Sequence, residues 1–143
     1  MEDSIIDSPL VEYTDEEYKY ASQFNSKEYD LKDNIDASYE KEESIPIGST
    51  DVADVSWIAP TGSITVTTMS KDSTMHGWSV VAQGKSSIAH KGMHRAAGIL
   101  AQAALKVIES PELQKKIKED FNKSKAGEEY ESLLPANVKP GDF

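Results

Sequence analysis

The amino-acid sequence predicts an α/β fold in which two strands pack against a long helix of small residues, with further helices flanking them. Three observations predict this fold. β-branched residues alternate over 62–69, apolar side chains alternate over 76–83, and apolar residues recur at helical spacing over 87–109. Alternation is typical of a strand with one buried face, and a helical period is typical of a helix that covers such a face.

Length, charge and composition restrict the classes of protein to which this chain can belong. The 143 residues suit one domain with a modest core, the net charge is −10, and there is no cysteine. Disulfides, thiolate metal ligands and a cysteine nucleophile are therefore excluded. An acidic chain repels phosphate backbones, so we expect no nucleic-acid partner. No apolar run approaches the ~20 residues that span a bilayer, so we expect no membrane partner.

The acidic start Met1-Glu2-Asp3-Ser4 lacks the basic-then-apolar order of a secretory signal, which predicts a cytoplasmic location. Negative charge is concentrated nearby. Residues 1–60 hold sixteen Asp and Glu against four Lys, whereas the remainder holds nine Asp and Glu against eleven Lys and Arg. We predict three segments: an acidic helix with an irregular connection over 1–47, a central part over 48–127, and an extended tail over 128–143.

The first predicted helix begins at Thr14. Thr14 is a suitable N-cap, and Glu17 stands three residues later, which is the spacing of a capping box. We expect this helix to continue to about Phe24. The polar stretch 25–46 that follows predicts an irregular connection with one helical turn.

A turn at Gly48 precedes the next predicted helix. Ser49 or Thr50 can cap a short helix over 51–58, and Pro60 ends it. The two predicted strands come next, with a polar loop between them. In the first strand, alternate residues share one face: Ile64, Val66 and Thr68. In the second strand, the same alternation places three residues together: Trp78, Val80 and Ala82.

The predicted helix over 87–109 carries many Ala and Gly residues. Small side chains allow close approach to a neighbouring element, so we expect this helix to be buried on more than one side. Ser110 then caps a further helix, with Pro111 at its first position, and Gly127 ends it. No internal repeat is present.

His76 is the first candidate functional residue. It stands between a polar loop and an apolar segment, and a neutral imidazole is a good zinc ligand. The alternative for a lone histidine is an ordinary loop or core position. His90 and His94 have the i, i+4 spacing of a metal-binding pair, but they lack the Glu of a zincin helix, so an ordinary polar face is the alternative.

Asp51 is the second candidate. It could orient a metal ligand or a polar group of a substrate. The alternative is an acid in the first turn of a helix, where it interacts favourably with the helix dipole. No catalytic nucleophile or dinucleotide motif is recognisable, and Lys85-Ser86-Ser87 before a helix offers only a weak anion site.

The order of these elements resembles the C-terminal part of the aminobenzoyl-glutamate utilisation protein B-like amidohydrolases, in the aminoacylase/carboxypeptidase family of co-catalytic zinc metallopeptidases. The resemblance runs from about Gly48 to Pro135, and a weaker one covers 13–17. It is carried by four motifs: Gly48-Ser49-Thr50-Asp51-Val52-Ala53-Asp54-Val55-Ser56-Trp57, Pro60-Thr61, His76-Gly77-Trp78, and Gly84-Lys85-Ser86-Ser87-Ile88-Ala89-His90-Lys91-Gly92-Met93.

The resemblance implies an α/β catalytic domain interrupted by a lid, with two zinc ions and a Glu as general base. By position His76 resembles the last metal ligand, contributed after the lid. Asp51, with Thr50 and Ser49, resembles the loop that lines the site. The other ligands and the base precede the lid in the family, so no catalytic residue is assigned to this chain. Gly77 departs from the family, where Ser usually follows the ligand His.

The expected function is therefore that of a C-terminal segment of a metal-dependent amidohydrolase. The substrate would carry an amide beside a carboxylate, as in aminobenzoyl-glutamate or an N-acyl amino acid, and the metal site would be incomplete in this chain alone. The expected partners are the N-terminal part of the enzyme or a complementary subunit, within a homo-oligomer. The alternative is a non-catalytic acidic module whose small-residue helix packs on a partner.

Overall fold

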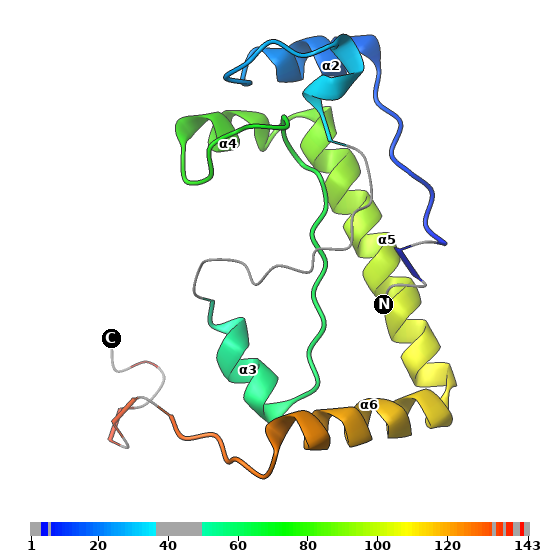
Figure 1. The fold of residues 1–143 in the computed structure, drawn as a ribbon, viewed down its shortest axis with the longest axis vertical. Helices are drawn as coiled ribbons and strands as arrows, with labels where there is room; N and C mark the ends of the chain where they lie inside the picture. Colours follow the sequence, from blue (N-terminus) through cyan, green and yellow to red (C-terminus); the bar gives the residue numbers. More distant parts are fainter. Residues whose placement is uncertain are drawn as a thin grey trace. The chain divides into compact units, whose positions relative to one another are not determined.

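The computed structural model describes residues 4–5, 7–36, 50–132, 134–135, 137–138 and 141. The elements in order are α2 (Asp15–Ser22), the 3-10 turn η1 (Leu31–Asn34), α3 (Val52–Ile58), α4 (Trp78–Gln83), α5 (Ser87–Glu109) and α6 (Pro111–Lys125) (Figure 1). Within these residues, no helix has the length and apolar character that a membrane crossing requires.

The chain divides into two compact units. The first joins Met1–Glu43 to Ser63–Glu109 and contains α2, η1, α4 and α5. The second joins Ser44–Gly62 to Ser110–Phe143 and contains α3 and α6. The three predicted sequence segments remain a prediction.

The predicted α/β fold is wrong, because the described residues contain helices and no strand. The alternating segment 62–69 is extended, but no neighbouring strand pairs with it in this part of the chain. The Thr67 hydroxyl in this segment donates to the Asp36 carbonyl, and just after the segment the Lys71 N–H donates to the Asn34 carbonyl at 3.0 Å. Alternation favours a strand, but a strand forms only where a second one satisfies its backbone groups.

The second predicted strand, over 76–83, is also wrong, because Trp78–Gln83 forms the short helix α4. Gly77 and Gly84 flank this helix at its two caps. A short apolar run fits a strand or a turn of helix equally well, so periodicity alone could not decide between them. Within the helix, Gln83 is turned into the interior, where it bonds to the preceding loop.

The predicted helix start at Thr14 is confirmed. The Thr14 hydroxyl accepts from the Glu17 N–H at 3.2 Å, and the Thr14 N–H donates to the Glu17 carboxylate at 2.7 Å. α2 then places Ala21 against Ile35 and Ile88, and these three side chains form the buried apolar cluster of this unit. The helical turn expected within 25–46 is η1, whereas residues 37–46 lie outside the described ranges.

The Glu17 carboxylate also joins α2 to α5. Its Oε1 accepts from the Ser87 hydroxyl at 2.5 Å, and its Oε2 accepts from the Lys91 ammonium at 2.6 Å. The side chain of Glu17 is only 9% exposed. Burial acts to raise the pKa of Glu17, but hydrogen bonds from Lys91, Ser87 and the Thr14 N–H outweigh it and hold the pKa below its ordinary value. The carboxylate is therefore a charged connection between the two helices.

α5 has the predicted bounds, and one of its faces is packed closely. Ile88, Gly92 and Ile99 are buried. A Cβ atom at Gly92 would lie 2.2 Å from the Thr67 carbonyl oxygen, so only glycine allows this approach to the extended segment. The expected burial on a second side is not met, because residues on another side of the helix, such as Leu100, are exposed.

The second unit contains the other two predicted helices. α3 ends at Ile58, and all of its residues are exposed. In α6 the Ser110 hydroxyl accepts from the Leu113 N–H at 3.2 Å, as the predicted cap requires. Ala126 and Gly127 both have positive φ at its end, which is a common C-terminal stop.

We expect Glu17→Gln to lower the free energy of unfolding by about 2 kcal/mol, because Lys91 loses a charged partner in a nearly buried position. Urea denaturation followed by circular dichroism measures this change. Asp15→Asn is the matched control, since it removes the same charge from an exposed position of the same helical turn. An equal loss in both variants would show that the charge of the turn, rather than the Lys91 contact, is responsible.

The same contact predicts a pH dependence of stability. Because the folded pKa of Glu17 lies below its unfolded value of about 4.3, its contribution is complete above that pH and is lost as the pH falls through the folded pKa. Urea midpoints between pH 6 and pH 3 should therefore fall less steeply in Glu17→Gln than in the wild type. Parallel curves would contradict the low pKa.

Candidate functional site

His76 lies in an exposed turn of the first unit, two residues before α4. Its backbone φ is +62°, a left-handed conformation that non-glycine residues seldom adopt. The next residue, Gly77, donates its N–H to the Thr74 carbonyl at 3.2 Å, and a Cβ there would lie 2.9 Å from the same oxygen. The missing side chain at Gly77 therefore permits this tight turn, and a serine at that position would force the turn to shift.

Gln83 connects α4 to the loop that leads into the His76 turn, a role that was not predicted from the sequence. Its side chain is fully buried. Its Oε1 accepts from the Ser70 N–H at 2.8 Å, and its Nε2 donates to the Ser73 hydroxyl at 2.8 Å. The only sequence signal is a glutamine that closes an apolar run, and this does not identify its partners.

Thr50 and Asp51 begin α3 in the second unit, and both are exposed. The Thr50 hydroxyl accepts from the Val52 N–H at 3.3 Å, which is a capping role. Asp51 occupies the N-cap position without a side-chain cap bond. Three residues on, Asp54 accepts from the Tyr130 hydroxyl at 3.2 Å.

The structure does not bring the predicted site residues together within one unit. Ser49 lies outside the described ranges, and Thr50 and Asp51 belong to a different unit from His76. His90 and His94 are exposed one turn apart on α5. Among the described residues, no group of three or more His, Asp or Glu side chains could hold a metal ion. The roles of His76 and the 49–51 turn therefore stay predictions.

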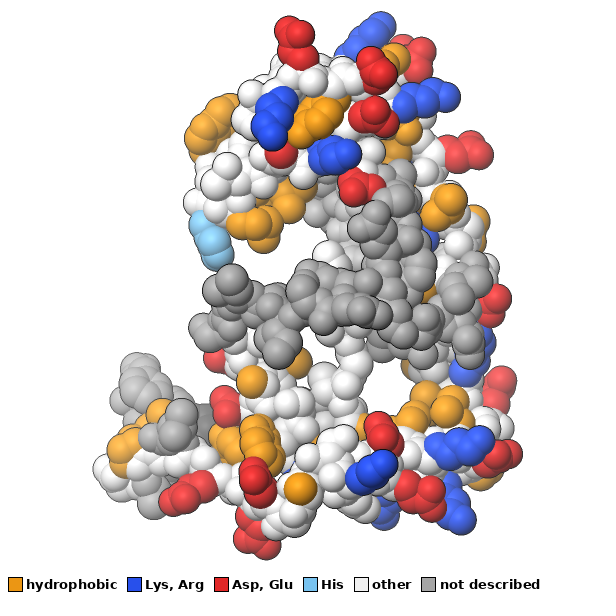
Figure 2. Space-filling view, viewed as in Figure 1, with side chains coloured by type: hydrophobic (Ala, Val, Ile, Leu, Met, Phe, Trp, Pro, Cys, Tyr) orange, Lys and Arg blue, Asp and Glu red, His pale blue; other side chains and the backbone are white. Residues whose placement is uncertain are grey.

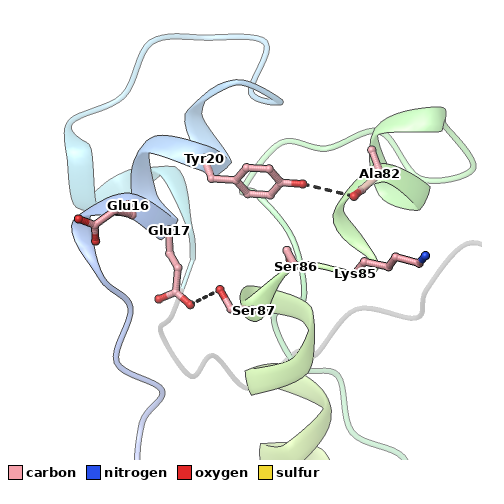
Figure 3. Close-up of a pocket in the computed structure, with 7 residues that line it drawn as sticks. All are labelled: Glu16, Glu17, Tyr20, Ala82, Lys85, Ser86 and Ser87. Carbon is pink, nitrogen blue, oxygen red and sulfur yellow. Dashed lines mark hydrogen bonds between the residues drawn. The ribbon is translucent and has the colours of Figure 1, made fainter.

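A cavity of about 420 Å³ lies in the first unit, where α2, α4 and the start of α5 meet (Figure 3). Its lining residues are Glu16, Glu17, Tyr20, Ala82, Lys85, Ser86 and Ser87. The Tyr20 hydroxyl donates to the Ala82 carbonyl at 3.3 Å on one side.

On the other side of the cavity, the Ser87 hydroxyl donates to Glu17 (Figure 3). The sequence Lys85-Ser86-Ser87 predicted a weak site for an external anion at the start of α5. In the structure the Glu17 carboxylate of the protein itself lies there. Because both Glu17 oxygens accept hydrogen bonds and its pKa is low, Glu17 is suited to connecting helices rather than to accepting a proton in catalysis.

Comparison with known proteins finds one informative similarity. The chain is 31% identical over 104 residues to a subunit of the p-aminobenzoyl-glutamate hydrolase of Escherichia coli (strain K12). The match covers 73% of this chain and 22% of that protein, so the chain spans less than a quarter of the length of its relative. No protein-family model matches the chain, and no solved structure shows significant similarity to it. The resemblance predicted from the motifs is confirmed.

We expect Gln83→Ala to lower the free energy of unfolding by about 2 kcal/mol, because it leaves the buried Ser70 N–H without its acceptor. Gln102→Ala, at an exposed position of α5, is the matched control and should change stability by less than about 0.5 kcal/mol. Urea denaturation measures both variants. Equal effects would contradict a structural role for Gln83.

Proposed function

This chain is a relative of the aminobenzoyl-glutamate utilisation protein B-like amidohydrolases, and we propose that it forms a C-terminal segment of such an enzyme. The complete enzyme would hydrolyse an amide bond beside a carboxylate. The observation that carries the proposal is the 31% identity over 104 residues, which include most of this chain. The substrate class comes from the name of the relative and from the family resemblance.

In this proposal His76 is one ligand of a two-zinc site, and Ser49, Thr50 and Asp51 line the space for the substrate. The exposed position of His76 in a left-handed turn supports its role, since such a conformation is often retained where a side chain must be aimed. The described residues do not build a metal site by themselves. We therefore assign no catalytic step to this chain, and the remaining ligands and the general base would come from the N-terminal part of the enzyme or from a complementary subunit.

A second candidate is a non-catalytic acidic module that binds a protein partner. Exposed apolar side chains favour it, among them Trp57 of α3 and Trp78 of α4. The reading frame upstream of Met1 distinguishes the two candidates. A continuous or adjacent frame with His, Asp and paired Glu ligands supports the enzyme, and a frame without them supports the module.

We expect the isolated 143-residue chain to bind no zinc stoichiometrically and to cleave no p-aminobenzoyl-glutamate. The physical reason is that zinc sites need three or four ligands, of which the proposal assigns only His76 to this chain. Calorimetric titration with zinc and an assay for released p-aminobenzoate measure the two properties. Tight one-to-one zinc binding or metal-dependent cleavage by this chain alone would refute the expectation.

The role of His76 is tested in a reconstituted enzyme. The complementing polypeptide is the E. coli relative without its 104 matched residues, and it is co-expressed with this chain. His76→Ala should abolish hydrolysis of p-aminobenzoyl-glutamate without changing the urea midpoint of the chain, because the residue is exposed. His90→Ala, an exposed histidine on α5, is the control and should keep wild-type activity. Retained turnover in His76→Ala would remove His76 from the metal site.

A further inference from the structure

One side of α5 carries exposed apolar side chains, and two exposed histidines, His90 and His94, lie next to them. Five apolar residues of α5 are separated by helical spacings of three, four or seven residues, or are adjacent, so they lie on one side of the helix. They are Met93, Ala97, Leu100, Ala101 and Ala104. We call this set the α5 stripe. Met93 is 54% exposed and Leu100 is 46% exposed, and the three alanines are exposed as well. Figure 2 shows hydrophobic side chains, in orange, at several places on the surface of the face that it draws.

The α5 stripe lies on the side of the helix that points away from the buried face. That face carries Ile88, Gly92 and Ile99, and it packs within the first unit. Charged and polar residues lie between these two faces on one flank: Lys91, Arg95 and Gln102. Apolar residues therefore occupy two faces of the helix, whereas a surface helix usually has one apolar stripe facing its core. Such a pattern is typical of a helix enclosed on two sides, and the residues of the α5 stripe are exposed in the described part of the chain.

We infer that the α5 stripe binds the complementary polypeptide that supplies the rest of the amidohydrolase. This inference rests on the proposed function. The relative contains a large amount of polypeptide with no counterpart in the match, because the chain covers only 22% of its length. The partner surface would be apolar and uncharged, since a charge placed against the α5 stripe would lose its water without gaining an opposite charge.

The geometry of the α5 stripe and the charge of the chain define this partner further. Ala97, Ala101 and Ala104 leave a shallow track between Met93 and Leu100, so the backbone of a partner element can approach the helix closely. A second copy of this chain is a poorer occupant, because each copy carries a net charge of −10 and the two would repel each other.

The test measures binding between the full 143-residue chain and the complementing polypeptide, by analytical ultracentrifugation. Leu100→Asp and Ala104→Asp should each weaken binding at least about 100-fold, because each places a charge in an apolar contact. Gln102→Asp adds a carboxylate at an exposed position on another side of the same helix, and it should bind as the wild type does. Urea midpoints of the three variants confirm that each remains folded.

Three results would overturn the inference: no complex with wild type, equal effects of Leu100→Asp and Gln102→Asp, or a homodimer that depends on the α5 stripe and excludes the complementing polypeptide. The proposed function fails by a different measurement. If the complex forms through the α5 stripe but does not hydrolyse p-aminobenzoyl-glutamate, the docking surface stands and the enzymatic assignment is wrong. If His76→Ala abolishes turnover while Leu100→Asp binds normally, the assignment stands and the docking surface is wrong.

Discussion

The Glu17 carboxylate holds two helices of the first unit together. It completes the capping box of α2 through the Thr14 N–H, and it accepts from Ser87 and Lys91 of α5. These contacts lie beside the apolar cluster of Ala21, Ile35 and Ile88, so one side chain joins the start of each helix to the core. Burying a carboxylate is costly, and here the several charged hydrogen bonds offset that cost. If α2 and α5 separated, the Glu17 carboxylate would lose its bonds to Ser87 and Lys91.

Features that depend on neighbours along the chain could be predicted from the sequence. The capping box at Thr14, the Ser110 cap and the stop at Gly127 are local, and the helices occur where these signals place them. The strands could not be predicted reliably, because pairing depends on a distant segment. The run 62–69 alternates, yet its described neighbours offer only isolated contacts, and Trp78–Gln83 satisfies its own backbone as a helix.

In the candidate site, too, features set by neighbouring residues could be predicted from the sequence, and contacts with distant residues could not. Sequence placed Thr50 and Asp51 at a helix start, and they lie there. It placed His76 at the start of a strand, whereas His76 lies in a turn before the helix α4. It did not reveal Gln83, because the acceptor and donor groups that make Gln83 structural come from the loop at Ser70 and Ser73. The grouping of His76 with the 49–51 turn comes from the family resemblance and stays a prediction, since these residues belong to different units.

The composition of α5 connects the fold to the proposed function. Gly92 is required by the close backbone of Thr67, so that small residue is explained within the first unit. Ala97, Ala101 and Ala104 are exposed and have no such explanation there. Exposed small residues contribute little to a core, but they would allow a second polypeptide to approach the helix. The same helix would then connect the first unit to the rest of the proposed enzyme, so that its assembly would depend on one element.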